Sequence, residues 1–162
     1  LIEELVQSNG AKRFLEITGG MLIKYNDKGE KEYEVFEPSE ALVEGDVLSL
    51  EEKFLAGEGQ NITPARFSKN PEEQKKISNY VKEQLRKAAE ILNVEGYCRI
   101  DAFVRIYDAD KVEVIIIEVN SLPGMTPATC IYHQAAINQY KPYEFIDAIL
   151  TQGMRRKKLS SV

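Results

Sequence analysis

Two acidic side chains, an amide and an arginine lie in two short stretches of the chain. The first stretch is Arg99-Ile-Asp101 and the second is Glu118-Val-Asn120. Carboxylate and amide oxygens are ligands for hard divalent cations such as Mg²⁺, and a guanidinium can clamp a phosphoryl oxygen or a developing oxyanion. These residue types predict a cation site that also receives an anionic ligand, such as the phosphates of a nucleotide.

A β-hairpin would bring the two stretches together. A polar turn, residues 108–110, separates them and leads into the apolar run 112–117. If the turn is centred between Ala109 and Asp110, the two acids lie opposite each other, and so do the arginine and the amide. Because residues two apart on a strand share a face, all four side chains then share one. A three-residue loop would shift the pairing by one residue and separate them.

The paired carboxylates have two alternative explanations. Two carboxylates on opposed strands repel each other unless something neutralises them. One solution is a Mg²⁺ ion, with Asn120 adding a neutral carbonyl oxygen. The other is a cross-strand salt-bridge network of Arg99, Asp101 and Glu118 on a solvated face.

The loop after the second stretch favours an anion-binding site. Pro123 and Gly124 are typical of a turn, and a glycine lets a ligand approach the backbone N–H closely. Thr126 followed by Pro127 is typical of a helix start, which predicts a helix over about 127–138. A helix N-terminus aimed at the cation site would receive an anion.

Taken together, these segments resemble a signature of the D-alanine–D-alanine ligases, members of the ATP-grasp superfamily. The family pattern is Arg-Ile/Val-Asp, a variable hairpin, and then Glu-x-Asn-Thr/Ser-x-Pro-Gly-Met/Phe-Thr, and the chain has every fixed element. The resemblance implies an α+β fold, the C-terminal subdomain of an ATP-grasp domain with an antiparallel β-sheet packed with helices. It also implies that residues 1–162 are part of a longer ligase, whose N-terminal domain and Gly-rich phosphate loop are absent here.

The resemblance implies roles for individual residues. Asp101, Glu118 and Asn120 would hold two Mg²⁺ ions (or Mn²⁺) against ATP, while Arg99 and the Gly124 N–H stabilise the oxyanion. The nucleotide would be bound by a hinge at the adenine (Glu3, Glu4, Leu5 and Val6), an acid at the ribose (Glu16) and a lysine at the phosphates (Lys53). Thr129 and Cys130 fall on the Ser-Leu pair with which the family holds the carboxylate of the second amino acid, and Cys130 departs from the leucine.

The reaction that the resemblance implies is the ATP-dependent joining of a carboxylate to an amine, here D-alanine to D-alanine for peptidoglycan precursor synthesis. ATP phosphorylates the first carboxylate, and the second amine attacks the acyl phosphate. Two alternatives stay open: another ATP-grasp carboxylate–amine ligase, and a nucleotide-binding module without turnover. We expect the isolated chain to be inactive, because it lacks half of the ATP site.

Composition excludes several classes of protein. The 162 residues carry a net charge of −5, which argues against a nucleic-acid surface. No apolar run is long enough to cross a membrane, and the acidic start does not resemble a signal peptide. With two cysteines in no metal motif, we expect a reduced, cytoplasmic protein. The expected partners are ATP and small amino acids, and the parent enzyme is expected to be a homodimer, as family members often are.

Hydrophobic patterning predicts the elements that position these residues. Strands are expected at 1–6, 14–25 and 31–36 and in the hairpin, and helices at 71–92, 127–138 and 142–152. The expected inward side chains are Ile77, Val81, Leu85, Ala88 and Leu92 in the first helix, and Phe145, Ile146, Ile149 and Leu150 in the last. Cys98 is expected in the core, and His133 is more simply a surface or capping residue than a general base. Residues 37–65 read as a functional or disordered loop, in which Lys53 is either the phosphate lysine or a solvated one.

Overall fold

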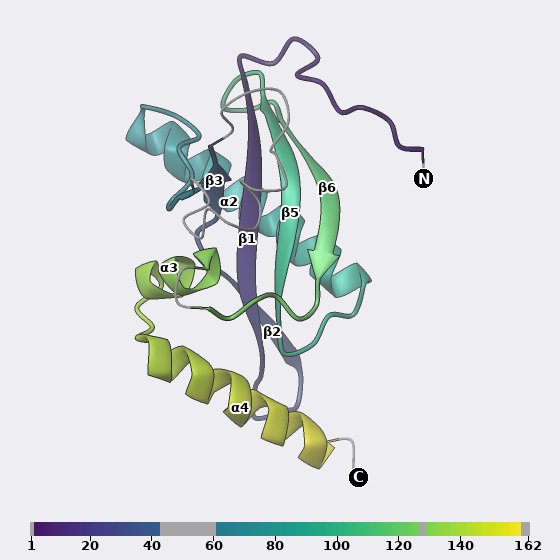
Figure 1. Ribbon diagram of the computed structural model, residues 1–162, viewed down its shortest axis with the longest axis vertical. Coiled ribbons are helices and arrows are strands. Elements are labelled where there is room, and N and C mark those ends of the chain that lie inside the picture. Colours follow the sequence, from purple (N-terminus) through teal and green to yellow (C-terminus); the bar gives the residue numbers. More distant parts are fainter. Residues whose placement is uncertain (1, 43–60, 127–128, 160–162) are drawn as a thin grey trace.

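The computed structural model describes residues 2–42, 61–126 and 129–159, with side chains described up to residue 155 (Figure 1). Lys53 therefore lies outside the described residues. The elements, in chain order, are β1 (Arg13–Tyr25), β2 (Lys31–Val35), β3 (Ser39–Ala41), β4 (Asn61–Ile62), α2 (Pro71–Ile91), β5 (Tyr97–Ile106), β6 (Val112–Asn120), α3 (Cys130–Ile137) and α4 (Pro142–Leu159).

The described strands form one antiparallel sheet. Their order is β4-β3-β1-β5-β6, and β2 pairs with the far end of the long strand β1. The predicted α+β fold, with an antiparallel sheet packed with helices, is confirmed. The predicted strands at 14–25 and 31–36 and the hairpin strands are confirmed as well, within a residue or two.

Helices cover both faces of this sheet. α2 packs on one face through the core of Ile77, Val81 and Leu85, and in Figure 1 it passes behind β1 and β5. α3 lies on the opposite face, where Ile131 joins a second core with Phe145 of α4. The sheet is thus the middle layer, and residues that alternate along its strands face different helices.

Two adjacent glycines in β1 let both helices come close. A Cβ added to Gly19 would lie 2.4 Å from Leu85 Cδ1 of α2, and one added to Gly20 would lie 2.5 Å from Gln134 Oε1 of α3. Both distances are shorter than real Cβ contacts, so any larger residue would force the Leu85 or Gln134 side chain, or its helix, to shift. The close approach of the helices at this point of β1 therefore depends on the absence of side chains.

The predicted start of α2 is confirmed, and its inward stripe is confirmed in part. Asn70 caps the helix, its Oδ1 accepting hydrogen bonds from the backbone N–H of Glu72 (2.9 Å) and Glu73 (3.2 Å). The buried stripe ends at Ala89, whereas Leu92 is 59% exposed. Leu92 is the C-cap, where the backbone leaves the helix, so the helical period no longer directs its side chain into the core.

The prediction of a strand over residues 1–6 is wrong for the described residues 2–6, which form no strand. Ile2 and Leu5 are exposed, and the segment extends away from the sheet (Figure 1). The chain reaches the sheet only at Gln7, whose carbonyl accepts a hydrogen bond from Arg105 Nε (2.7 Å). Apolar residues alone did not make a strand here, because in the described chain no neighbouring strand pairs with them.

The predicted bounds of the last two helices are also corrected. α3 begins at Cys130 rather than 127, because its N-cap, Thr129, has an extended backbone (φ −77°, ψ 144°). α4 continues to Leu159 rather than ending near 152. Its last turns are rich in Met, Arg and Lys, which are good helix formers.

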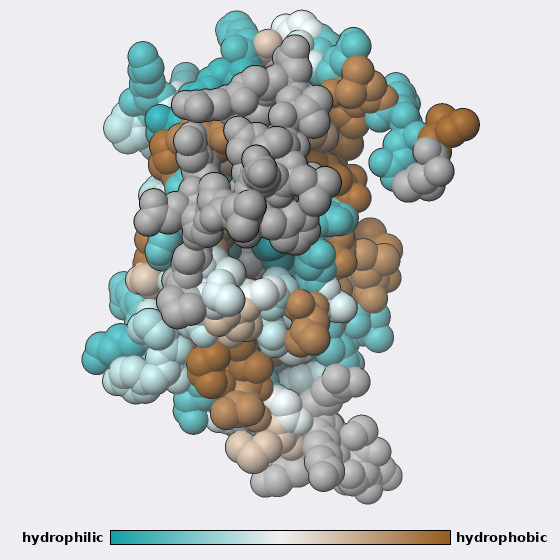
Figure 2. Space-filling model, in the orientation of Figure 1, coloured by the Kyte–Doolittle hydropathy of each residue, from teal (hydrophilic) through white to brown (hydrophobic). Residues whose placement is uncertain are grey.

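The inward face of α4 is only half as predicted. Phe145 is fully buried and Ile149 is partly buried, but Ile146 (37% exposed) and Leu150 (60% exposed) are not in the core. In Figure 2, hydrophobic surface gathers over the first half of α4. None of the described helices is long and apolar enough to cross a membrane.

Candidate active site

The hairpin of β5 and β6 brings the four predicted side chains together at its open end. Arg99 pairs with Asn120, and Asp101 pairs with Glu118, as the sequence pattern predicts. Nearer the turn, however, the two strands pair one residue out of that register, so the turn is not centred where the pattern placed it. A β-bulge at Ile117 absorbs the extra residue and restores the predicted pairing at the site.

The four side chains form a connected network. Arg99 makes two bonds to Asp101, from Nε to Oδ1 (3.1 Å) and from Nη2 to Oδ2 (2.9 Å). The Asn120 amide nitrogen donates to Glu118 Oε1 (2.9 Å) and to Asp101 Oδ2 (3.3 Å). Arg99 Nη2 also lies 3.7 Å from Glu118 Oε1. One guanidinium thus neutralises both carboxylates, in a site where Asp101 is mostly buried and Glu118 is exposed.

The donor set of this network fits a hard divalent cation. Asp101 and Glu118 supply carboxylate oxygens, and a half-turn of the Asn120 amide would point its oxygen, rather than its nitrogen, at the same place. In the described part of the chain, no group of three or more His, Cys, Asp or Glu side chains has metal-binding geometry. Two carboxylates and an amide suit Mg²⁺, which usually takes one or two carboxylates and completes its shell with water and substrate phosphates.

The neighbouring strand β1 brings some of the predicted nucleotide residues to this face and leaves others away from it. Thr18 pairs with Asp101 and Glu16 pairs with Phe103, so Glu16 shares the face of the acidic pair. Glu3 to Leu5, predicted at the adenine, lie in the exposed N-terminal segment, and Val6 is half-buried there. Glu16 therefore shares a sheet face with the acidic pair, whereas residues 3–6 precede the sheet.

The loop after β6 folds back towards α3. A Cβ added to Gly124 would meet only Thr129 Cγ2, at an ordinary 3.8 Å, so packing does not require a glycine there. The Thr129 hydroxyl donates to the carbonyl of Thr126 (2.8 Å). Gly124 and Thr129, which were predicted to act on the substrates, are thus close to each other.

Cys130, in the first turn of α3, lies beside the acidic network. Burial raises the pKa of its thiol, while the nearby Arg99 lowers that pKa and Asp101 raises it. Ser39 of β3, near the thiol, also lowers this pKa. The other cysteine, Cys98, is fully buried, as predicted, and burial raises its pKa to about 12.

Gln134 is a positioning side chain that the sequence analysis missed. It is fully buried, its Oε1 accepts from the N–H of Gly20 (2.8 Å), and its Nε2 donates to the carbonyl of Thr18 (2.8 Å) and to Ser39 Oγ (2.9 Å). Because Gly20 pairs with Arg99 and Thr18 with Asp101, Gln134 ties α3 to the strand beside the site. Its signal in the sequence is its place on the helical stripe of Ile131. His133 is exposed, as its surface interpretation predicts.

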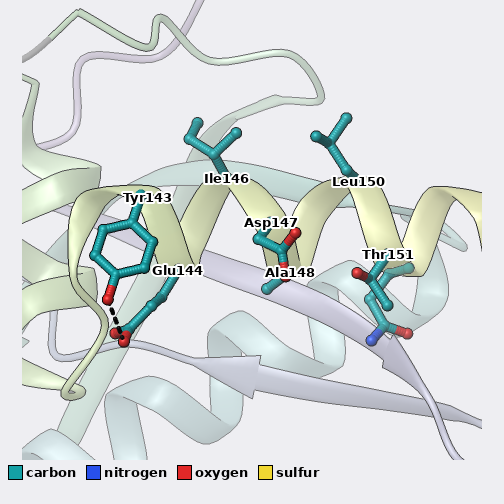
Figure 3. Close-up of a pocket in the computed structure, with 8 residues that line it drawn as sticks. Tyr143, Glu144, Ile146, Asp147, Ala148, Leu150 and Thr151 are labelled. Carbon is teal, nitrogen blue, oxygen red and sulfur yellow. Dashed lines mark hydrogen bonds between the residues drawn. The ribbon is translucent and has the colours of Figure 1, made fainter.

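A shallow groove of about 550 Å³ runs along α4 (Figure 3). Ile146 and Leu150 point outward from the helix, and the Tyr143 hydroxyl donates to Glu144 (3.1 Å). The residues that line the groove include none of the predicted site residues. The groove is therefore separate from the acidic network of the hairpin.

Comparisons of the sequence and of the fold with known proteins both match the chain to one family. The family described as "D-ala D-ala ligase C-terminus" matches residues 15–151. A D-alanine–D-alanine ligase of Leptospira interrogans is 30% identical over 142 residues, which is 88% of this chain and 37% of that protein. A D-alanine–D-alanine ligase B of Clostridium perfringens is 30% identical over 125 residues, which is 76% of this chain and 37% of that protein.

Solved structures show the same fold. A Bacillus anthracis D-alanine–D-alanine ligase, complexed with ATP, superposes with a TM-score of 0.55 at 18% identity, covering 90% of this chain and 40% of that one. A D-alanyl-alanine synthetase A of Vibrio cholerae gives 0.55 at 20% identity, covering 86% and 39%. The chain thus spans about two fifths of the length of these proteins.

Proposed function

The chain belongs to the D-alanine–D-alanine ligase C-terminal family, and on that premise we propose that it forms the C-terminal part of an ATP-dependent carboxylate–amine ligase. The proposed reaction joins D-alanine to D-alanine through an acyl phosphate, in the cytoplasm, as a step of peptidoglycan precursor synthesis. A longer chain would supply the remaining part of the ATP site and the pocket for the first amino acid. Residues 1–162 alone would therefore not catalyse the reaction. A homodimeric parent enzyme is part of the same proposal.

One observation carries this proposal: the bulged hairpin pairs Asp101 with Glu118 and Arg99 with Asn120 on one face of the sheet. The same four residues lie in the segments that resemble the ligase signature. A solvated salt-bridge network would need the charges but not the amide, and it would not need the Pro-Gly turn that follows. The combination supports a site for a cation and a phosphorylated ligand.

Each side chain has a proposed task in the reaction. Asp101, Glu118 and Asn120 would hold the Mg²⁺ ions, which neutralise charge on the ATP phosphates when bound. Arg99, once it leaves Asp101, can turn its guanidinium to the oxyanion that develops at the substrate carboxylate. Gly124 would donate its backbone N–H to the same oxygen.

The remaining proposed contacts orient the substrates. Lys53 would neutralise the γ-phosphate, Glu16 would bind the ribose hydroxyls and residues 3–6 would contact the adenine. Thr129 and Cys130 would hold the carboxylate of the second amino acid at the start of α3. Burial raises the pKa of the Cys130 thiol, which favours an uncharged thiol beside the bound carboxylate.

The test is ADP release by the full-length protein with Mg-ATP and a panel of D-amino acids, with the L-amino acids as matched controls. We expect ADP release that depends on D-alanine, with D-alanyl-D-alanine as the product. Turnover with a different acceptor would support the ligase chemistry but not D-alanine as the second substrate. The choice of acceptor would then depend on Thr129, Cys130 and the rest of the full-length protein. ATP binding without turnover under any of these conditions would contradict the proposed activity.

A further inference from the structure

The hydroxyl of Thr18 is buried beside the candidate cation site and has no hydrogen-bond partner in the described structure. Thr18 stands between two polar neighbours on the same face of the sheet, Ser39 across β3 and Asp101 across β5. A buried hydroxyl without a partner destabilises a fold, so a specific instance calls for an explanation.

The neighbours of Thr18 already have partners of their own. Ser39 Oγ receives Gln134 Nε2 (2.9 Å) and shares a hydrogen bond with Thr63 Oγ1 (2.6 Å). Both carboxylate oxygens of Asp101 are bonded to Arg99. The Thr18 hydroxyl is therefore left out of a row of polar groups whose other members are joined.

The backbone of Thr18 is held firmly at this place. Gln134 receives the N–H of Gly20 and donates to the Thr18 carbonyl, each at 2.8 Å, and so fixes the backbone of β1 directly after the hydroxyl-bearing side chain. Side chains of directly paired residues in an antiparallel sheet have Cβ atoms about 5 Å apart, which lets a threonine hydroxyl reach a carboxylate on the next strand. Thr18 pairs directly with Asp101, yet its hydroxyl makes no bond to the carboxylate in the described structure, where both carboxylate oxygens bond to Arg99.

We infer that Thr18 is a positioning residue for Asp101. When a divalent cation binds and displaces Arg99, the Thr18 hydroxyl donates to the Asp101 oxygen that Arg99 releases and fixes the orientation of the carboxylate. Hydrogen bonds from groups around a metal site orient its ligands in this way, and losing one typically weakens metal binding about 10- to 100-fold. This inference rests on the proposed cation site.

The test compares Thr18→Val with Thr18→Ser, each measured for thermal stability without metal and for Mn²⁺ binding by electron paramagnetic resonance. Thr18→Val removes an unpartnered hydroxyl and keeps the branched shape, so Tm should rise by about 2 °C or more while the Mn²⁺ Kd rises about tenfold. Thr18→Ser keeps the hydroxyl and should bind Mn²⁺ as the wild type does. A purely structural role would move stability and binding in the same direction.

Thr63→Val is the matched control, because it makes the same substitution at a hydroxyl that has a partner. It should lower Tm and leave the Mn²⁺ Kd within about twofold of the wild-type value. Wild-type affinity in Thr18→Val, or a lower Tm in that variant, would overturn the inference and leave the cation site standing. A wild-type chain that binds no Mn²⁺ would overturn the cation site of the proposed function, and this inference with it.

Discussion

Replacing Gln134 with Leu should loosen α3 from the strand that faces the candidate site. Leucine has nearly the volume of glutamine, so Gln134→Leu removes hydrogen bonds and leaves the apolar packing of Ile131 largely intact. Three bonds are lost, those to the Gly20 N–H, the Thr18 carbonyl and Ser39 Oγ. The variant therefore measures how much a buried polar contact contributes to holding this helix.

The hydrogen bonds of Gln134 give the expected loss in free energy of unfolding. The Gly20 N–H would be left buried without its acceptor, which costs about 1–3 kcal/mol. The two donated bonds contribute about 0.5–1.5 kcal/mol each, and Ser39 keeps its bond to Thr63. The loss should total about 2–6 kcal/mol, which at about 3 °C per kcal/mol corresponds to a fall in Tm of roughly 6–18 °C for a chain of this size.

The assay is urea unfolding of the chain, followed by far-UV circular dichroism. The midpoint should fall with little change in the slope, because the same surface is exposed on unfolding. Gln7→Leu is the matched control, since Gln7 lies in the exposed N-terminal segment. Its free energy of unfolding should stay within about 0.5 kcal/mol of the wild-type value. A Gln134→Leu variant as stable as Gln7→Leu would show that apolar contacts alone hold α3, and would refute the reasoning.

Two further predictions concern titratable groups. Burial raises the pKa of Cys98 to about 12. In the Cys130→Ser variant at pH 8, a thiol reagent should therefore label Cys98 only as fast as the chain unfolds around it. Labelling within minutes in the native state would contradict this. Burial alone would raise the pKa of Glu40, but hydrogen bonds from Arg66 outweigh it and lower that pKa below 4.5. The stabilisation by Glu40 should therefore be complete above pH 4.5 and be lost as pH falls through the lowered pKa. In urea unfolding, the free energies of unfolding of Glu40→Gln and wild type should converge in acid. A difference between the two free energies that stays constant with pH would contradict this.

The hairpin shows how far the sequence pattern reaches. Alternation along the strands predicts that Asp101 and Glu118 share a face, and they do. The pattern assumed an even loop, whereas the strands next to the turn pair one residue away from that register. The bulge at Ile117 corrects the shift, and a run of isoleucines gives no local signal for where a bulge will form.

Contacts between distant segments were beyond the sequence pattern. Nothing local to β1 shows that Thr18 will pair with Asp101, because that pairing joins strands far apart in the chain. For the same reason, the periodicity of α4 predicts a helix but does not tell which of its apolar stripes faces the sheet, so Phe145 was placed correctly and Leu150 was not. Buried polar residues such as Gln134 are hardest to predict, since their partners come from other elements.

If the acidic pair of the hairpin holds the catalytic cation, Glu118→Gln, which removes one of its two carboxylates, should slow turnover sharply. The measurement is D-alanine-dependent ADP release by the full-length protein, with Glu113→Gln as the control. Glu113 lies on the same strand, but it pairs with Arg105 instead of Asp101, and its Oε2 lies 3.2 Å from Arg105 Nη1. We expect kcat to fall at least about 100-fold in Glu118→Gln and to stay within a few-fold of the wild-type value in Glu113→Gln. Near-normal turnover in Glu118→Gln would contradict it.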